Sequence, residues 1–490
     1  MYTLDTLPFE NRFAQLPAHF YARVKPTPLI NARLFSFNEA AAQLIQLDPQ
    51  EAQNPAFTAY FNGERAWAGT QPISMLYAGH QFGTYVPQLG DGRAIILGET
   101  QGFELQLKGS GPTPFSRFSD GRAVIRSTVR EYLCSEAMHA LGIPTTRALC
   151  MLVSDEEVYR ERLEHGALLV RMAASHIRFG SFEVFFHRRQ YEQLRQLADF
   201  VLVNHFPELQ TTAEPYLALF ASVVQRTARL MAQWQCVGFA HGVMNTDNMS
   251  ILGLTLDYGP YGFLDVYDPG FICNHTDQQG RYAFDQQPSI GLWNLNALAH
   301  AFLPLLAEDP DEAVEKARSA LVQYQTEFDQ AWLVGMRAKL GLQQGLPSDE
   351  GLIADLLIKM QQNLVDYTIF FRRLSKLGQA AKGGTEQSIR DLFVDRSAFD
   401  TWAMQYRERL AQEQSVDTER QLRMQQVNPA YILRNYMAQQ AIAKAEQGDA
   451  SEVDLLLKLL QQPFTEQPGM ERYLDHPPAW ADSISVSCSS

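Results

Sequence analysis

Apolar side chains in residues 76–170 occur in short runs separated by glycine, a pattern typical of strands joined by tight turns. Within residues 103–108, apolar and polar side chains alternate. This period of two predicts a half-buried strand that carries Lys108 on its polar face. Three further apolar runs predict strands: Ala94–Leu97, Ala148–Val153 and Ala167–Met172.

A helical period replaces the strand pattern after residue 126. Apolar positions from Val129 to Leu141 recur every four residues, and Gly142 supplies a stop, so residues 127–141 are predicted as a helix. Residues 1–70 mix short helical and irregular stretches. Later apolar periodicity predicts helices at Tyr216–Gln235 and around 311–340, 350–373, 388–412, 430–447 and 451–461.

The length and net charge of the chain indicate how many domains it has and which partners are unfavourable. A chain of 490 residues exceeds one hydrophobic core, so two or three domains are expected. A net charge of −14 argues against nucleic acid as a general partner. No apolar run approaches the ~20 residues that span a bilayer, and the N-terminus lacks a signal-peptide pattern, so no membrane partner and a cytoplasmic location are expected.

The chain has five cysteines, and none forms a CxxC pair, which argues against a zinc site. Cys488 differs from the others because it lies in the small polar tail 485–490. An exposed, mobile thiol at that position is able to react.

The stretch His241–Gly259 has the layout of a kinase-type catalytic loop followed by an Asp-aromatic-Gly turn. In kinases, an aspartate two residues after the histidine accepts the substrate proton, and an asparagine five residues later holds magnesium. The asparagine position falls at Asn248, but the base position is Val243, which cannot accept a proton. A carboxylate stands beside the metal ligand instead, at Asp247.

Asp257 follows the apolar run Ile251–Leu256, which Gly253 breaks into a predicted hairpin. Oxygen ligands from Asn248 and Asp257 suit Mg²⁺ or Mn²⁺. The alternative is an Asx turn plus a surface aspartate.

Two elements that precede the loop 241–259 would complete a nucleotide site, and they occur in the same order as in kinases. Gly90 and Gly92 form a tight turn whose backbone N–H groups could approach phosphates, although a plain hairpin turn would look the same. Lys108 would reach the phosphates and pair with Glu131 on the next helix, as in kinases. Alternatively, Lys108 is a surface lysine, and Glu131 closes a capping box with Thr128.

Arg171 and Arg178 add positive charge further along the chain. They could bind phosphate groups, or they could instead form ion pairs on the surface. The order of these motifs predicts an α+β, bilobal protein-kinase-like fold with an extended helical C-terminal region. The predicted division is an N-terminal extension (1–75), an N-lobe (76–170), a C-lobe (171–300) and a helical C-terminal region (301–490).

The chain resembles the selenoprotein O family of kinase-like protein adenylyltransferases over nearly its whole length. The resemblance rests on these segments: 78–83, 89–93, 107–111, 121–124, 178–180, 241–249 and 488–490. The run 241–259 is the most specific of its motifs.

The resemblance implies that ATP binds flipped relative to a kinase, so that AMP passes to Ser, Thr or Tyr of a protein substrate. It implies that Asp247 accepts the proton and that Asn248 and Asp257 hold the metal. The resemblance also implies a set of nucleotide contacts. They are Asp257, Gly90, Gly92, Arg93, Lys108, Asp120, Gly121, Arg171 and Arg178.

The residues themselves leave two alternatives open, a phosphotransferase that uses Asp247 as its base and a non-catalytic nucleotide-binding scaffold. They name no protein substrate and leave the oligomeric state open, with a monomer as the working expectation.

A regulatory disulfide between Cys273 and Cys488 is also predicted. Cys273 follows the Asp-aromatic-Gly turn where a kinase has its activation segment, and some family members carry selenocysteine at the position of Cys488. The alternative is that both thiols stay reduced in the cytoplasm.

Overall fold

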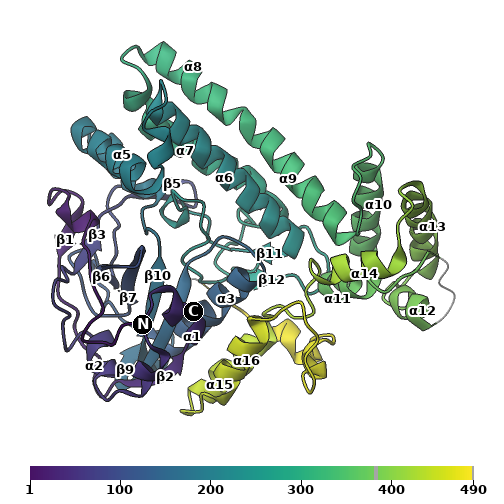
Figure 1. The fold of residues 1–490 in the computed structure, drawn as a ribbon, viewed down its shortest axis with the longest axis horizontal. Coiled ribbons are helices and arrows are strands. Elements are labelled where there is room, and N and C mark those ends of the chain that lie inside the picture. Colours follow the sequence, from purple (N-terminus) through teal and green to yellow (C-terminus); the bar gives the residue numbers. More distant parts are fainter. Residues whose placement is uncertain (380–383, 488–490) are drawn as a thin grey trace.

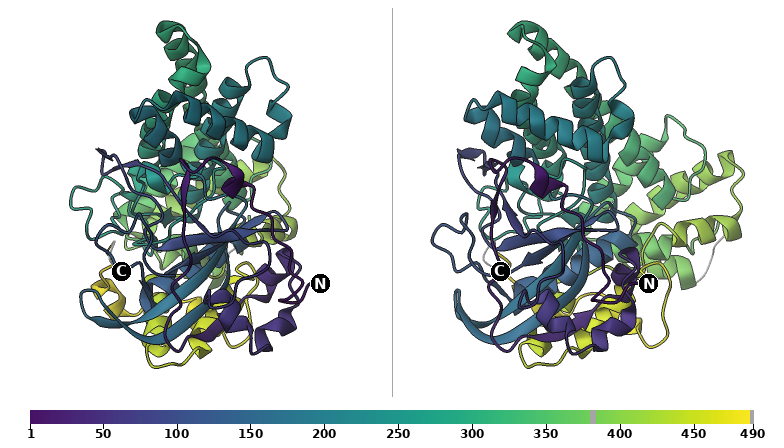
Figure 2. Two further views of the ribbon diagram at one scale, coloured as in Figure 1. Left: turned by 90° about the vertical axis from the view of Figure 1, so that its left-hand side faces the viewer. Right: turned by 60° about the vertical axis from the view of Figure 1, so that its left-hand side comes forward.

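The computed structural model describes residues 1–379 and 384–487. It combines one large antiparallel sheet, built mainly from the first third of the chain, with a long series of helices (Figure 1). In both views of Figure 2 the teal helices lie above the sheet and the yellow C-terminal helices lie below it.

The large sheet has eight strands in the order β1-β3-β6-β7-β10-β9-β2, with β8 paired to β10. Every pairing in it is antiparallel. The strands are β1 (Tyr21–Arg23), β2 (Arg33–Phe37), β3 (Ile73–Met75), β6 (Ala94–Thr100), β7 (Phe103–Lys108), β8 (Ala123–Val124), β9 (Arg147–Tyr159) and β10 (Leu163–Ala173).

The four predicted strands are present as β6, β7, β9 and β10, but the prediction that β7 is half-buried is wrong. Leu105 and Leu107 pack on one face, and the polar side chains of Glu104 and Gln106 are also buried on the other. They satisfy their polar atoms there: Glu104 accepts from the His176 backbone, and Gln106 accepts from Arg171. Both faces of β7 are covered in this protein, and the alternation showed only which face is polar.

The N-terminal segment supplies strands β1 and β2, at the two ends of the sheet order, and two short helices, α1 (Glu39–Leu44) and α2 (Phe57–Phe61). These two strands were not predicted, because runs of three to five residues carry too little periodicity to separate them from irregular chain.

Helix α3 (Ile125–Ala140) matches the helix predicted at 127–141. It packs against β9 and β10 on one side and against helices α15 (Asn435–Ala445) and α16 (Ser451–Leu460) on the other (Figure 1). Because the helix begins at Ile125, Thr128 lies inside it, and the capping box that could have occupied Glu131 does not form.

The central helices form a layered bundle in which α6 contacts α7, α8 and α9. One described stretch, Phe284–Leu306, is long and apolar enough to cross a membrane, and 56% of its most apolar window is buried inside the molecule. Packing against α4, α6 and α8 accounts for that composition. The helices are α4 (Phe179–His187), α5 (Tyr191–His205), α6 (Pro215–Val237), α7 (Gln287–Leu306), α8 (Pro310–Leu321) and α9 (Gln323–Lys339).

A second hydrophobic core lies among the later helices. The long helices predicted at 311–340, 350–373 and 388–412 are each divided into two, and one further helix, α14, was not predicted. These elements are α10 (Asp349–Gln362), α11 (Tyr367–Leu374), α12 (Gly384–Arg390), α13 (Arg396–Gln412) and α14 (Asp417–Gln425). Apolar periodicity continued across the breaks because both helices of each pair have buried faces.

Two further pairs of short strands are present: the hairpin of β4 (Gly79–Gln81) with β5 (Thr84–Val86), and the two-stranded sheet of β11 (Phe239–Ala240) with β12 (Gly262–Phe263). Between β11 and β12 the chain forms the loop 241–261, which contains the short 3-10 turn η4 (Thr246–Asn248). The hairpin predicted at Ile251–Leu256 is a turn instead, joined to the rest of the chain by the isolated bridges Arg178–Ser250 and Thr145–Thr255.

Candidate active site

A cleft of about 960 Å³ separates the sheet from the loop 241–261. Most of the residues predicted for nucleotide or metal binding line it together: Gly90, Gly92, Arg93, Lys108, Arg171, Asp247, Asn248 and Asp257. Its volume lies within the range of small-molecule sites. Segments far apart in the sequence therefore converge on one cavity.

Asp257 lies in a cluster of cations beside this cleft. Arg171 Nη1 donates to its Oδ1 at 2.5 Å, and Arg178 Nη1 donates to its Oδ2 at 2.6 Å. Lys108 Nζ lies 3.7 Å from Oδ1. Burial alone would raise the pKa of Asp257, but the positive charges of Arg171 and Arg178 hold that pKa well below its usual range. The carboxylate is therefore ionised at neutral pH.

The backbone at Asp257 has a φ of +58°, in the left-handed region that few non-glycine residues adopt. Two buried guanidinium groups fix the side chain in place, and this supports the uncommon backbone conformation.

Glu131 on α3 joins the same charge network. Lys108 Nζ contacts Glu131 Oε2, and Arg171 Nη1 donates to Glu131 Oε1 at 3.0 Å. Burial lowers the pKa of Lys108, and the charge of Glu131 offsets part of that effect. Both Lys108 and Arg171 thus reach the cleft from neighbouring strands of the sheet, where β7 pairs with β10.

Arg178 does not line the cleft but holds two of its elements in place. The residue is buried, precedes α4, and donates from Nη1 both to the Asp247 backbone oxygen at 2.8 Å and to Asp257. One guanidinium therefore fixes the distance between the η4 turn and the Asp257 carboxylate.

Asp247 is a buried carboxyl group whose side chain has one hydrogen-bond partner among the described residues. Gln81 Nε2 donates to its Oδ2 at 3.2 Å, and its Oδ1 has no hydrogen-bond partner among the described residues. Burial raises the pKa of Asp247 to about 7, although the charge of Arg178 opposes this. A carboxyl group with this pKa exchanges protons near neutral pH, as a general base must.

The β4 hairpin packs directly on Asp247, and this close packing requires glycine. A Cβ on Gly79 would lie 2.6 Å from Asp247 Oδ1, and a Cβ on Gly180 would lie 2.0 Å from the Ala78 backbone oxygen. Any larger side chain would push the hairpin, η4 and α4 apart.

Asn248 and His241 organise the loop itself. Asn248 Nδ2 donates to the Val243 backbone oxygen at 2.9 Å, which leaves the amide oxygen as the atom suited to a cation. His241 is buried, stacks on Trp234 and contacts the Leu256 backbone oxygen through Nε2 at 2.9 Å. Its ring is therefore committed to the structure of the loop.

The Gly90–Gly92 turn closes the other side of the cleft. Gly90 has a φ of +100°, and a Cβ there would lie 2.6 Å from the Phe115 ring and 2.9 Å from the Met75 oxygen. The turn is thus packed against a following loop rather than being a free hairpin end. Arg93 follows it at the entrance to β6 and lines the cleft.

Asp120 and Gly121 are not among the residues that line the cleft. Asp120 pairs with Arg160, whose Nη1 lies 2.7 Å from Asp120 Oδ2. A Cβ on Gly121 would lie 2.1 Å from the Gly111 oxygen, so glycine is required by a close approach of two backbones. Asp120 contacts Arg160 and the Arg122 backbone, and both arginines line the cleft. Asp120 is therefore placed to orient arginines at the edge of the cleft.

Sequence reasoning did not single out several residues that reach the cleft. Gln81 contacts Asp247, and Arg117 and Arg160 line the cleft, Arg160 in its ion pair with Asp120. Arg160 lies near Arg122, which belongs to the segment 121–124 of the family resemblance, and their proximity depends on the β8–β10 and β9–β10 pairings. No local pattern around Arg117 or Arg160 indicates that they reach the cleft.

The structure describes only one of the two cysteines predicted to pair, Cys273. Cys273 is buried, and its Sγ donates to the Ala240 oxygen at 3.4 Å. Cys488 lies outside the described residues. The tail does reach this region, because His275 N donates to the Val486 oxygen at 2.9 Å.

Comparison with known proteins gives one family. The model of the family "Protein adenylyltransferase SelO" matches residues 3–461. The relatives include proteins named "Protein nucleotidyltransferase YdiU" from Thioalkalivibrio sulfidiphilus, 57% identical, and from Myxococcus xanthus, 55% identical, each aligned over 100% of both chains. A cleft with clustered cations, an ionised aspartate and a second carboxyl group that titrates near neutrality agrees with nucleotide chemistry, and the chain belongs to the SelO family of protein adenylyltransferases.

Proposed function

We propose that this chain transfers AMP from ATP to Ser, Thr or Tyr hydroxyls of protein substrates, with Asp247 as the proton acceptor. The observation that carries the proposal is the position of Asp247: a buried carboxyl group with a pKa of about 7 lines the same cleft as Asn248 and Asp257. The choice of AMP over phosphoryl transfer rests on the family.

The proposed architecture is a bilobal kinase-like enzyme. The Gly90–Gly92 turn, the Lys108–Glu131 pair and the loop 241–261 border one cleft, which is the order of parts in kinases. The division into an extension (1–75), an N-lobe (76–170), a C-lobe (171–300) and a helical region (301–490) remains part of this proposal.

Asn248 and Asp257 would hold Mg²⁺ or Mn²⁺ with the nucleotide. The hydrogen bonds from Arg171 and Arg178 use one lone pair on each Asp257 oxygen, so further lone pairs remain for a cation. When bound, the metal would neutralise phosphate charge and orient the triphosphate. The surrounding cations would repel a metal ion that enters alone. They favour binding of the metal together with the anionic nucleotide.

The chain's own groups would then position and activate the two reactants. Lys108, Arg93, Arg171 and the backbone of Gly90 and Gly92 would bind phosphate oxygens, with Arg178, Asp120 and Gly121 supporting that set. Asp247 would take the proton of the incoming hydroxyl as its oxygen bonds to the α-phosphorus. Pyrophosphate leaves with the electron pair of the broken bond.

The Cys273–Cys488 disulfide remains part of the proposal as a regulatory bond. Its support is the backbone bond between His275 and Val486, which brings the tail beside the segment that contains Cys273. We also propose a monomeric, cytoplasmic enzyme.

ATP labelled on the α- or γ-phosphate distinguishes the three possible activities. With protein substrate and Mn²⁺ or Mg²⁺, the α-label should become acid-stable on protein and the γ-label should not. Transfer of the γ-label would establish a phosphotransferase instead, and transfer of neither label, with ATP still bound, would favour a scaffold. Heat-unfolded protein provides the background.

Asp247→Asn should lower the transfer rate by about 10²- to 10⁴-fold while leaving ATP affinity largely unchanged, because the side chain acts on the hydroxyl. Wild-type transfer should rise with pH through about 7, as the carboxylate forms. Rates and calorimetric affinities measured from pH 5.5 to 8.5 check both. A wild-type rate in the variant would exclude Asp247 as the base.

The same substitution should change stability with pH in a defined direction. Folding raises the pKa of Asp247, so the folded protein disfavours the charged form, and this destabilisation is complete above about pH 7. Asp247→Asn should therefore melt at a higher temperature than wild type at pH 8, with a smaller difference at pH 5. A difference independent of pH would contradict the raised pKa.

Asp257→Asn should weaken Mg²⁺-ATP or Mn²⁺-ATP binding by at least about tenfold, since the carboxylate charge that balances the metal is lost. Asparagine keeps a hydrogen-bond acceptor for the buried arginines, and circular dichroism controls for folding. Asn248→Ala should show a milder loss. Calorimetry that found unchanged metal-ATP affinity in Asp257→Asn would remove it as a ligand.

Oxidation should slow protein modification by wild type, and reductant should restore the rate, if the Cys273–Cys488 bond tethers the tail. Cys488→Ser should make the rate independent of redox state, and Cys150→Ser serves as a control in a buried strand. Peptide mapping of the oxidised protein that found both thiols free, while activity still changed, would rule out this pair.

A further inference from the structure

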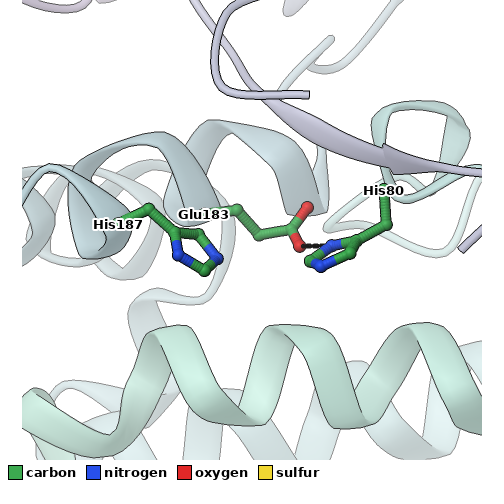
Figure 3. A group of neighbouring side chains, drawn as sticks. All are labelled: His80, Glu183 and His187. Carbon is green, nitrogen blue, oxygen red and sulfur yellow. Dashed lines mark hydrogen bonds and ion pairs between the residues drawn. The ribbon is translucent and has the colours of Figure 1, made fainter. Parts of the chain in front are cut away.

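A second cluster of ligand-type side chains lies behind the cleft. Glu183 and His187 stand four residues apart on α4 and so share one face of that helix, and His80 approaches from β4. Figure 3 shows the Glu183 carboxylate lying between the two imidazoles. One potential ligand atom from each residue lies within 4.8 Å of the other two.

A hydrogen bond explains part of this arrangement. His80 Nδ1 lies 2.5 Å from Glu183 Oε1, which alone could be a structural contact. His187 is not explained in that way, because its ring nitrogens take part in no hydrogen bond among the described residues. Its ring instead packs on Tyr85 with centroids 3.9 Å apart.

The surrounding contacts hold the potential ligands in fixed orientations. Thr246 Oγ1 donates to the second oxygen of Glu183 and accepts from the His80 backbone N–H at 2.7 Å. Trp293 packs against the His80 ring at a centroid distance of 5.3 Å. Outer contacts of this kind orient the ligands of protein metal sites.

The chemistry of the three side chains differs from that of the nucleotide cleft. Asn248 and Asp257 offer oxygen only, as Mg²⁺ and Mn²⁺ prefer, whereas two imidazole nitrogens and one carboxylate form a typical ligand set for zinc and its neighbours in the first transition row. Three protein ligands leave room for water in a fourth position.

We propose that His80, Glu183 and His187 form a second cation site, separate from the nucleotide site and selective for Zn²⁺-like ions. The bound ion would join β4 to the C-terminal end of α4. Gln81 of the same hairpin contacts Asp247, so a bound ion would help to fix the position of the proposed base. The proposal does not depend on AMP transfer.

Cobalt provides a direct test, because Co²⁺ in a four- or five-coordinate histidine site absorbs visible light. The full-length protein is stripped of metal with a chelator, dialysed and titrated with Co²⁺ without nucleotide. Wild type should show one saturable site whose absorption is abolished by competing Zn²⁺. Asp257→Asn should behave like wild type, since its side chain belongs to the other site.

His187→Ala should weaken Co²⁺ binding by at least about tenfold. This side chain is exposed at the end of its helix, so the fold should be preserved. His19→Ala, at another exposed histidine, is the matched control and should bind as wild type does. His187→Cys should restore binding and shift the spectrum, because a thiolate replaces the imidazole.

Thermal melting gives a second measurement. Zn²⁺ at about 100 times its Kd should raise the melting temperature of wild type and His19→Ala but not of His187→Ala. The proposal is overturned if wild type binds no Co²⁺ saturably, or if His187→Ala binds Co²⁺ with the same affinity and spectrum as wild type.

Discussion

The charge cluster around Asp257 is the interaction on which the site depends. One carboxylate accepts hydrogen bonds from Arg171 on β10 and Arg178 before α4, and Lys108 on β7 lies within reach. Glu131 on α3 completes the cluster. Each of these buried charges would be costly alone, but the two carboxylates offset most of the charge of the three cations, and their contacts hold the sheet, α3, α4 and the loop together.

This arrangement gives the two aspartates opposite properties. Asp257 is surrounded by positive charge and stays ionised, whereas Asp247 is buried with little compensation and its pKa rises to about 7. Two carboxyl groups whose environments separate their pKa values in this way are suited to different roles. Arg178 joins both, because it contacts the backbone of Asp247 and the side chain of Asp257.

Packing around the site explains why the chain extends far beyond the cleft. Helix α3 carries Glu131 and lies between the sheet and the late helices α15 and α16. Residues 305 positions apart therefore hold this helix in place, as Arg130 on α3 and Asn435 on α15 illustrate with a hydrogen bond at 3.3 Å. The β4 hairpin similarly connects Asp247 to α4 through Gln81, His80 and Glu183.

The sequence by itself determined the strands β6, β7, β9 and β10, helix α3 and the motif His241–Gly259, because local periodicity and fixed spacing specify them. It also identified the family. Only the tertiary structure decided that Glu104 and Gln106 are buried, that Glu131 forms no capping box, and that Arg160 reaches the cleft rim. It likewise brought His80 beside His187, because burial and long-range proximity depend on how elements pack, which no local pattern records.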